Sequence, residues 1–363
     1  MSEIVKRYNL VIIGDTHFGV RNNSMTWLKH QKDGFKEIID YVEKSMYSYD
    51  WTHVVHVGDL FDSRSSINPL IWREVVKLLS DMDGVLNCRP DKGEHGGHMT
   101  IIGGNHDYYY PWESDHNFTS IQMLPKFENI GRLVNSWGRC KNTIMIPWFV
   151  FHNKKLLKEA VDLMHEDDII ITHTDPYHMD PEIRKLVGKH PLITGHIHQP
   201  NMDWETFWLV TGATYPIDFT DTNSRRGFWT IEYEYVRDDE SGSILKGIKN
   251  MKVDFHPVES SIHFHSLTED NLENWGDYGI KEDDYVEIII KQSHVEDHKE
   301  TIKELNDKFT TSMTYLPEES RVLMEDDDIL TADAVCRKLL PPKLKDCYNQ
   351  MVTSCEKKES LMS

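Results

Sequence analysis

The chain has 363 residues and a formal net charge of −20 at pH 7, which indicates that it binds nucleic acid only weakly by itself. This length suits a catalytic core with a smaller addition, and the hydrophobic fraction of 39% is enough to build that core. No apolar run is long enough to span a membrane, no signal-peptide core is present, and the five cysteines form no CxxC pair. We therefore expect a reduced, cytoplasmic protein outside the membrane.

Five short, β-branched apolar runs predict strands that are buried on both faces. They cover residues 10–13, 54–57, 100–102, 169–171 and 192–194. Between them, apolar residues at helical spacing predict helices over residues 33–44 and 69–79. Strands that alternate with helices indicate a layered α/β domain.

Each of these runs is followed by residues that commonly bind metal ions. Strand ends in an α/β sheet meet at one edge, so these side chains are expected to converge. Carboxylate, amide and imidazole donors without cysteine suit a catalytic pair of manganese, iron or zinc ions more than a structural zinc site. Any one of these histidines alone is typical of an ordinary core or surface residue; the order of all five clusters indicates the site. The candidate donors are Asp15, His17, Asp59, Asn105, His173, His196 and His198.

In chain order the motifs read DxH, GDxxD, GNHD, a lone His and GHxH, a pattern that resembles the calcineurin-like metallophosphoesterase superfamily. Within it, the chain resembles the SbcD-type nuclease subunits of DNA double-strand-break repair complexes, in the short form that T-even-like bacteriophages encode. Residues 32–36, 146–148 and 226–229 support that branch, and the resemblance covers about residues 10–230. It implies a layered β-sandwich core flanked by helices, with a small α+β capping domain and a C-terminal helical tail.

The resemblance also implies two divalent metal ions, most simply Mn²⁺, with Mg²⁺ or Fe²⁺ as alternatives. Asp59 would bridge the ions, and His106 would face the scissile phosphate as proton donor or charge stabiliser. The fourth motif departs from many relatives, which carry Gly before the histidine where this chain has Thr172. The implied ligand sets are Asp15, His17, Asp59 and His198 for one ion, and Asp59, Asn105, His173 and His196 for the other.

Two acidic residues near His106 have alternative interpretations. Asp62 could orient and charge His106 as the second member of a catalytic dyad, or it could cap the loop that follows. Asp107 could touch the chemistry or cap the next turn.

Arg64 and the aromatic residues after the catalytic loop are candidates for contact with DNA. Tyr108, Tyr109 and Trp112 could stack on a frayed base, or they could belong to a packed loop. The polar loop at 91–98 is placed outside the site.

Two helical segments match, by position, the helices through which relatives form dimers. They are the helix that begins at Pro69 and the segment with Phe118, Ile121 and Leu124. Their apolar stripes indicate a homodimer interface or simply the core.

The predicted organisation has four parts: a nuclease domain at 1–220, a capping domain at 221–312, an acidic linker at 313–328 and a helical segment at 329–363. Strands at 251–256 and 285–291 and a helix at 295–309 are expected in the capping domain. In the last segment an apolar face at helical spacing predicts docking to the coiled coil of an SMC-like ATPase of the SbcC/Rad type, or packing on the cap. That face consists of Leu344, Tyr348, Met351 and Val352.

These features together predict a two-metal, Mn²⁺-dependent DNA phosphodiesterase, both exonuclease and endonuclease, in an SbcCD-type repair and recombination complex. Its substrates would be double-stranded ends and single-stranded regions of DNA, in the host bacterial cytoplasm if the protein is phage-encoded. The alternative within the superfamily is a phosphomonoesterase or small-molecule phosphodiesterase. A non-catalytic scaffold is disfavoured, because such descendants lose ligands and here every ligand position is filled.

Overall fold

A computed structural model describes residues 4–87, 97–109, 118–165, 168–217, 225–237, 245–259, 263–282 and 284–316. The chain divides into two units, residues 1–290 with 294–315 and residues 291–293 with 316–363, and the described fold lies almost entirely in the first. Trp112, most of the loop at 91–98 and the whole predicted docking segment lie outside the described residues.

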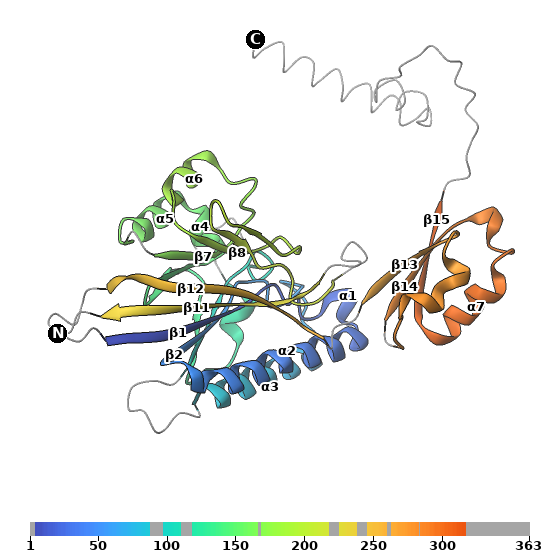
Figure 1. Cartoon of the computed structure of the whole chain (residues 1–363), viewed down its shortest axis with the longest axis horizontal. Helices are drawn as coiled ribbons and strands as arrows, with labels where there is room; N and C mark the ends of the chain where they lie inside the picture. The colour runs from blue at the N-terminus through green and yellow to red at the C-terminus, as the bar shows by residue number, and fades with distance from the viewer. Residues whose placement is uncertain are drawn as a thin grey trace, which may run out of the picture. The chain divides into compact units, whose positions relative to one another are not determined.

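Two six-stranded sheets form the core of the first unit (Figure 1), with strand orders β12-β11-β1-β2-β3-β4 and β5-β6-β7-β8-β10-β9. The first sheet contains β1 (Ile4–Ile13), β2 (Trp51–His56), β3 (His98–Ile102), β4 (Ile130–Leu133), β11 (Gly227–Arg237) and β12 (Leu245–Pro257). The second contains β5 (Gly138–Cys140), β6 (Thr143–Ile146), β7 (Ile169–His173), β8 (Leu192–Gly195), β9 (Asn201–Asp203) and β10 (Trp208–Val210).

The two sheets face one another across a buried apolar layer. Leu10 and Val55 of the first sheet belong to the same cluster as Ile171 and Ile193 of the second. Within each sheet the central strands run parallel, β1 beside β2 beside β3 and β6 beside β7 beside β8. The carboxyl ends of these strands therefore lie at a common edge of the sandwich, where the predicted donors follow.

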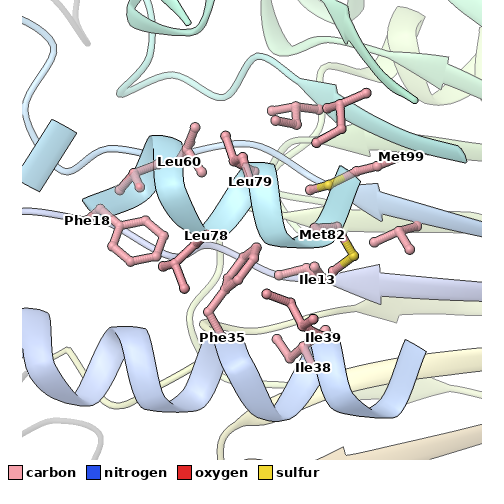
Figure 2. Close-up of a cluster of buried hydrophobic side chains, with 14 of the residues drawn as sticks. Ile13, Phe18, Phe35, Ile38, Ile39, Leu60, Leu78, Leu79, Met82 and Met99 are labelled. Carbon is pink, nitrogen blue, oxygen red and sulfur yellow. The ribbon is translucent and has the colours of Figure 1, made fainter. Parts of the chain in front are cut away.

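Helices cover the outer face of each sheet. On the first sheet, α2 (Met25–Ser45) lies beside α3 (Pro69–Asn87), and Figure 2 shows Phe35 and Ile38 of α2 facing Leu78 and Met82 of α3. The second sheet packs against α4 (Trp148–His152), α5 (Lys154–Val161) and α6 (Pro181–Val187). In the described ranges, no helix combines the length and apolar character that a bilayer span requires. The remaining short elements are α1 (Val20–Asn23), η1 (Met46–Ser48) and η2 (Ser120–Met123).

A smaller three-stranded sheet follows the core in the chain. It consists of β13 (Phe264–Thr268), β14 (Tyr285–Lys291) and β15 (Thr310–Leu316), together with η4 (Leu272–Tyr278), η5 (Gln292–His294) and α7 (Lys299–Lys308). Leu267, Ile288 and Leu305 form its own buried cluster with their neighbours. The layered α/β fold with a β-sandwich core is thus confirmed.

Some predicted boundaries within this fold are wrong. Strands β11 and β12 lie next to β1 in the first sheet, so the core continues to Pro257 and does not end at residue 220. The helix expected over 295–309 begins at Lys299. Residues 313–316 belong to β15 and not to a linker. β11 lies between β12 and β1 and not at a sheet edge, and an alternating pattern does not specify which sheet a strand joins, which explains the first error.

Candidate metal centre

The seven predicted donors come from the carboxyl ends of five parallel strands. Asp15 follows β1, Asp59 follows β2 and Asn105 follows β3 in the first sheet. His173 is the last residue of β7, and His196 follows β8 in the second sheet. The structure brings all seven together at this edge, so that both sheets contribute to one site.

Asp15, His17 and His198 form the first donor group, with candidate ligand atoms within 4.8 Å of one another. The Nε2 atoms of His17 and His198 lie 3.2 Å apart, and Asp15 Oδ2 lies 3.8 Å from His198 Nε2. Two imidazole nitrogens that share one ion at about 2.1 Å are separated by about 3–3.5 Å. These separations therefore fit a common divalent cation.

Asp59, His173 and His196 form the second group, again within 4.8 Å, and Asn105 lies inside it. Asn105 Oδ1 is 2.8 Å from both His173 Nε2 and His196 Nδ1. Asp59 Oδ2 is 3.3 Å from His173 Nε2 and 3.7 Å from His17 Nε2, so this carboxylate stands between the groups. The chemistry of the donors and their spacing fit two divalent cations that share Asp59.

The backbone is strained at three of the donor positions. His17, Asp59 and His196 have φ values of 41°, 51° and 79°, in the left-handed region that side chains with a Cβ rarely occupy. Each residue lies just past a strand end, where the chain turns sharply enough to direct its side chain at the site. Strain of this kind, at about 1–3 kcal/mol per residue, is concentrated at functional sites.

Two motif glycines leave the space that the carboxylates occupy. A Cβ at Gly104 would lie 2.3 Å from Asp59 Oδ1, and one at Gly195 would lie 2.4 Å from Asp15 Oδ1. Real Cβ atoms do not approach oxygen so closely, so any side chain here would displace a donor. The glycines in the third and fifth motifs thus serve the geometry of the site directly.

Burial and mutual charge perturb the protonation of these donors. Burial raises the pKa of Asp15 to about 7, against the opposing effect of His173. Burial alone would lower the pKa of His173, but the carboxylates of Asp59 and Asp15 raise it to about 9. Burial alone would raise the pKa of Asp59, whereas His173 and His17 hold it well below its usual range. A proton on His173 therefore balances the buried carboxylates, and a cation that binds must displace it.

His106 is held beside the first group by contacts on two sides. Its backbone N–H donates to Asp59 Oδ1 at 2.8 Å, and its Nδ1 donates to the main-chain oxygen of Asp62 at 2.7 Å. The Asp62 carboxylate instead lies 3.4 Å from Nδ1 of His17. A carboxylate oxygen of Asp62 also lies within 4.8 Å of a ring nitrogen of His106, in one group with His17, so the dyad stays a prediction. In this structure Asp62 contacts His106 through its carbonyl group and His17 through its side chain.

The buried side chain of Asp107 connects separate segments of the chain through hydrogen bonds. Its Oδ2 accepts hydrogen bonds from the backbone N–H groups of Gly104 at 2.9 Å and Leu60 at 3.4 Å, and its Oδ1 accepts from Ser120 Oγ at 3.3 Å. Burial and the neighbouring Asp59 charge raise the pKa of Asp107 to about 7. These contacts are with earlier loops and with Ser120, and not with the turn that follows Asp107, so the side chain of Asp107 connects segments around the site.

Two further side chains support the site and were not assigned to it from the sequence. Gln31 of α2 is buried and donates from Nε2 to the main-chain oxygens of Thr16 at 2.7 Å and His17 at 3.0 Å. Arg226 is 4% exposed and donates from Nη1 to the main-chain oxygen of His198. Gln31 could have been found from the sequence, because it is a polar residue on the otherwise apolar, buried face of α2.

The residues predicted to contact DNA differ in their exposure to solvent. Tyr108 is fully buried, and its hydroxyl donates to the main-chain oxygen of Val134 at 2.5 Å, so its ring cannot stack on a base. Tyr109 is 44% exposed, and Arg64 is exposed. Ile121 and Leu124 belong to the core, as do most apolar residues of α3. Leu70 at the start of α3 and Phe118 are exposed, at 38% and 54%, so the two stripes are core only in part.

Several basic side chains that could have formed a DNA track are neutralised within the protein. Lys158 pairs with Asp162 at 2.6 Å, Lys154 pairs with Glu182 at 2.5 Å, and Lys32 pairs with Glu74. Carboxylates therefore neutralise these lysines, and the lysines do not form a positively charged surface.

Comparison with known proteins agrees with this geometry. The chain is 24% identical over 252 residues to exonuclease subunit 1 of Enterobacteria phage T4, an alignment that covers 62% of this chain and 65% of the phage protein. Residues 8–200, which carry all seven donors and His106, match the calcineurin-like phosphoesterase family. A match over more than half of the chain, on a site with this donor set, shows that the protein belongs to the calcineurin-like phosphoesterase family.

Proposed function

We propose that this protein is a two-metal DNA phosphodiesterase, with exonuclease and endonuclease activity, that uses Mn²⁺ and works as the nuclease subunit of an SbcCD-type complex in the cytoplasm. The observation that carries the proposal is the pair of donor groups that share Asp59, with His106 fixed beside them. The proposed ligands are Asp15, His17, Asp59 and His198 for one cation, and Asp59, Asn105, His173 and His196 for the other. The name of the phage relative supports an exonuclease.

The roles of the protein groups follow from their positions. When bound, the two cations would acidify water and stabilise charge on a phosphate oxygen. His106 uses Nδ1 to donate to the Asp62 carbonyl, so Nε2 is the ring nitrogen left for substrate. In its imidazolium form, Nε2–H can donate to the leaving oxygen of the phosphodiester. Asp62 keeps His17 oriented, and Gln31 and Arg226 hold the backbones of the first and fifth motifs.

The choice of a diester substrate is tested by direct competition. Full-length protein with Mn²⁺ is given a linear DNA duplex and, separately, para-nitrophenyl phosphate. We expect efficient turnover of the duplex and little of the monoester, and no turnover of either after the metal is removed by chelation. Preference for the monoester would favour the alternative, a phosphomonoesterase of the same family.

The charge of the chain supports a partner in DNA binding. With a net charge of −20 and surface lysines paired to carboxylates, the protein should bind DNA weakly alone. We propose that an SMC-like ATPase supplies the positive surface, and that Leu344, Tyr348, Met351 and Val352 dock to it. A pulldown after co-expression with such an ATPase tests this assembly.

We also propose a homodimer that is formed through the face near the start of α3. Leu70 and Met123 are exposed there, at 38% and 58%. Light scattering of the purified chain measures the mass directly, and a Leu70→Glu substitution should convert a dimer to a monomer.

A further inference from the structure

His56 is a fully buried histidine that is not one of the seven donors. It is the last residue of β2 and lies three residues before Asp59 in the chain. A buried neutral imidazole needs a hydrogen-bond partner for each ring nitrogen, because one nitrogen donates and the other accepts. The partners of His56 therefore show which parts of the protein it holds together.

Both ring nitrogens of His56 have a partner beside the metal centre. The backbone N–H of Gly58 donates to Nδ1 at 3.3 Å, so Nδ1 is the accepting nitrogen. The proton of the neutral ring then lies on Nε2, which donates to Thr16 Oγ1 at 2.9 Å. Burial lowers the pKa of His56 to about 3, in agreement with a neutral ring. These contacts fix a single tautomer of His56.

The hydroxyl group of Thr16 continues this chain of hydrogen bonds. It accepts from His56 and donates to the main-chain oxygen of Leu60 at 3.1 Å. Thr16 is fully buried, and Gly58 and Leu60 directly flank Asp59 in the chain. The hydrogen bonds therefore run from one side of the shared carboxylate residue, through His56 and Thr16, to its other side.

The turns of the first and second motifs also contact each other through the main chain. The N–H groups of Thr16 and His17 donate to the main-chain oxygen of Asp59, at 3.2 and 3.0 Å. Gly58, Asp59 and His17 have φ values of 115°, 51° and 41°. Backbone in such conformations persists only where the surrounding contacts hold it. The hydrogen bonds of His56 and Thr16 supply contacts of this kind from inside the protein.

We propose that His56 and Thr16 are positioning residues, which hold the turns of the first and second motifs together so that Asp59 can serve both cations. The inference rests on the proposed two-metal function and adds two residues that bind neither metal nor substrate. Residues that orient metal ligands from outside the coordination shell change metal affinity or activity by about 10–100-fold when they are replaced. Without the Thr16 hydroxyl, the Nε2–H group of His56 would be buried without its acceptor, and the two turns could move apart.

The same strand provides a matched control. His53 is also buried, burial lowers its pKa to about 3, and its Nε2 lies 3.0 Å from Thr100 Oγ1. This pair joins β2 to β3 within the first sheet. At about 3.3 Å per residue, His53 lies about 10 Å from the carboxyl end of β2, where His56 is found. Loss of the bond between His53 and Thr100 should reduce stability and leave the metal centre unchanged.

The test measures Mn²⁺ binding in full-length variants of the two positioning residues. Thr16→Val replaces the hydroxyl group by a methyl group, whereas Thr16→Ser keeps it. His56→Asn keeps an acceptor for Gly58, but its shorter side chain ends before the position of Nε2. We expect Thr16→Val and His56→Asn to weaken Mn²⁺ binding by about tenfold in calorimetric titrations, and Thr16→Ser to bind as the wild type does.

Two further readouts separate positioning from general stability. The electron paramagnetic resonance spectrum of the loaded protein reports the exchange coupling between the two Mn²⁺ ions, which should change in Thr16→Val and His56→Asn. At saturating Mn²⁺, kcat for DNA should fall by about tenfold in these variants, while KM changes little because neither residue contacts the substrate. His53→Asn and Thr100→Val should lower the melting temperature but keep the affinity and the spectrum of the wild type.

Unchanged Mn²⁺ affinity and exchange coupling in Thr16→Val and His56→Asn would overturn the proposal. Equal changes in the control variants would overturn it too, because the effect would then be one of stability alone. If Thr16→Val does not fold, His56→Asn and Thr16→Ser decide the question by the same readouts. If the wild type binds Mn²⁺ but cleaves only para-nitrophenyl phosphate, the proposed DNA phosphodiesterase function is wrong, whereas weaker Mn²⁺ binding by the variants still supports the positioning roles.

Discussion

Metal binding by this protein should depend steeply on pH, because the ligands hold protons that the cations must displace. In the absence of metal, the pKa of His173 is raised to about 9 and that of Asp15 to about 7. Both groups bind metal only when deprotonated, so a fall in pH strengthens the competing proton and weakens the metal. Affinity should therefore rise with pH.

The two pKa values set the size of the effect. Between pH 8 and pH 6, a proton at a pKa of about 9 weakens metal binding by about a hundredfold, and one at about 7 weakens it by about tenfold. His173 belongs to one donor group and Asp15 to the other. The second cation should thus lose about a hundredfold in affinity and the first about tenfold.

Calorimetric titration of Mn²⁺ into the metal-free, full-length protein measures this directly. Titrations at pH 6, 7 and 8, in two buffers with different ionisation enthalpies, give both the affinities and the number of protons released. His173→Asn should remove the hundredfold component, because an amide ligand does not titrate in this range. The component from Asp15 should then exceed tenfold, because the charge of His173 no longer lowers the pKa of Asp15. His294→Asn, at a partly exposed histidine of the smaller sheet domain, is the matched control. Affinities that do not change with pH, or binding without proton release, would refute this account of the site.

Four further predictions concern three single side chains and the C-terminal segment. His106→Ala should keep the fold and both cations, while kcat for DNA cleavage falls by about 10²–10⁴-fold. Metal analysis and steady-state kinetics measure these two effects. Retained activity would show that His106 has no part in the mechanism. Asp59→Ala should release both cations, whereas loss of only one in elemental analysis would show that it does not bridge. Asp62→Asn should weaken the first cation by about 10–100-fold while kcat at saturating Mn²⁺ changes little, because the carbonyl that holds His106 remains; a collapse of kcat would support the dyad of Asp62 and His106. Deletion of residues 317–363 should spare cleavage of simple substrates and abolish capture of the ATPase, and a pulldown that survives it would contradict the docking proposal.

The donor set was accessible from the sequence because each donor follows a short buried strand. Apolar runs such as residues 10–13 and 169–171 have a strong periodic signal, and parallel strands bring their ends to one edge. The structure places every predicted donor there, and it confirms the layered fold that the alternation indicates.

What could not be predicted depends on main-chain contacts and on pairing between distant strands. The contact that orients His106 is a carbonyl oxygen of Asp62, which any residue type could have supplied. Tyr108 belongs to an aromatic run whose composition does not reveal which ring is buried. The short strands of the second sheet, such as β5 and β9, have three residues each and therefore too little pattern to detect.

Each donor group draws its side chains from both halves of the sandwich. Asp15 and His17 follow β1 of the first sheet while His198 follows β8 of the second, and Asp59 lies opposite His173 in the same way. Cations bound there would tie the two sheets together along one rim. By mass action the loaded protein then gains about 2.7 kcal/mol for a cation at a hundred times its dissociation constant. We therefore expect the melting temperature to rise with the concentration of free metal, and the metal-free protein to be digested by proteases more readily than the loaded one.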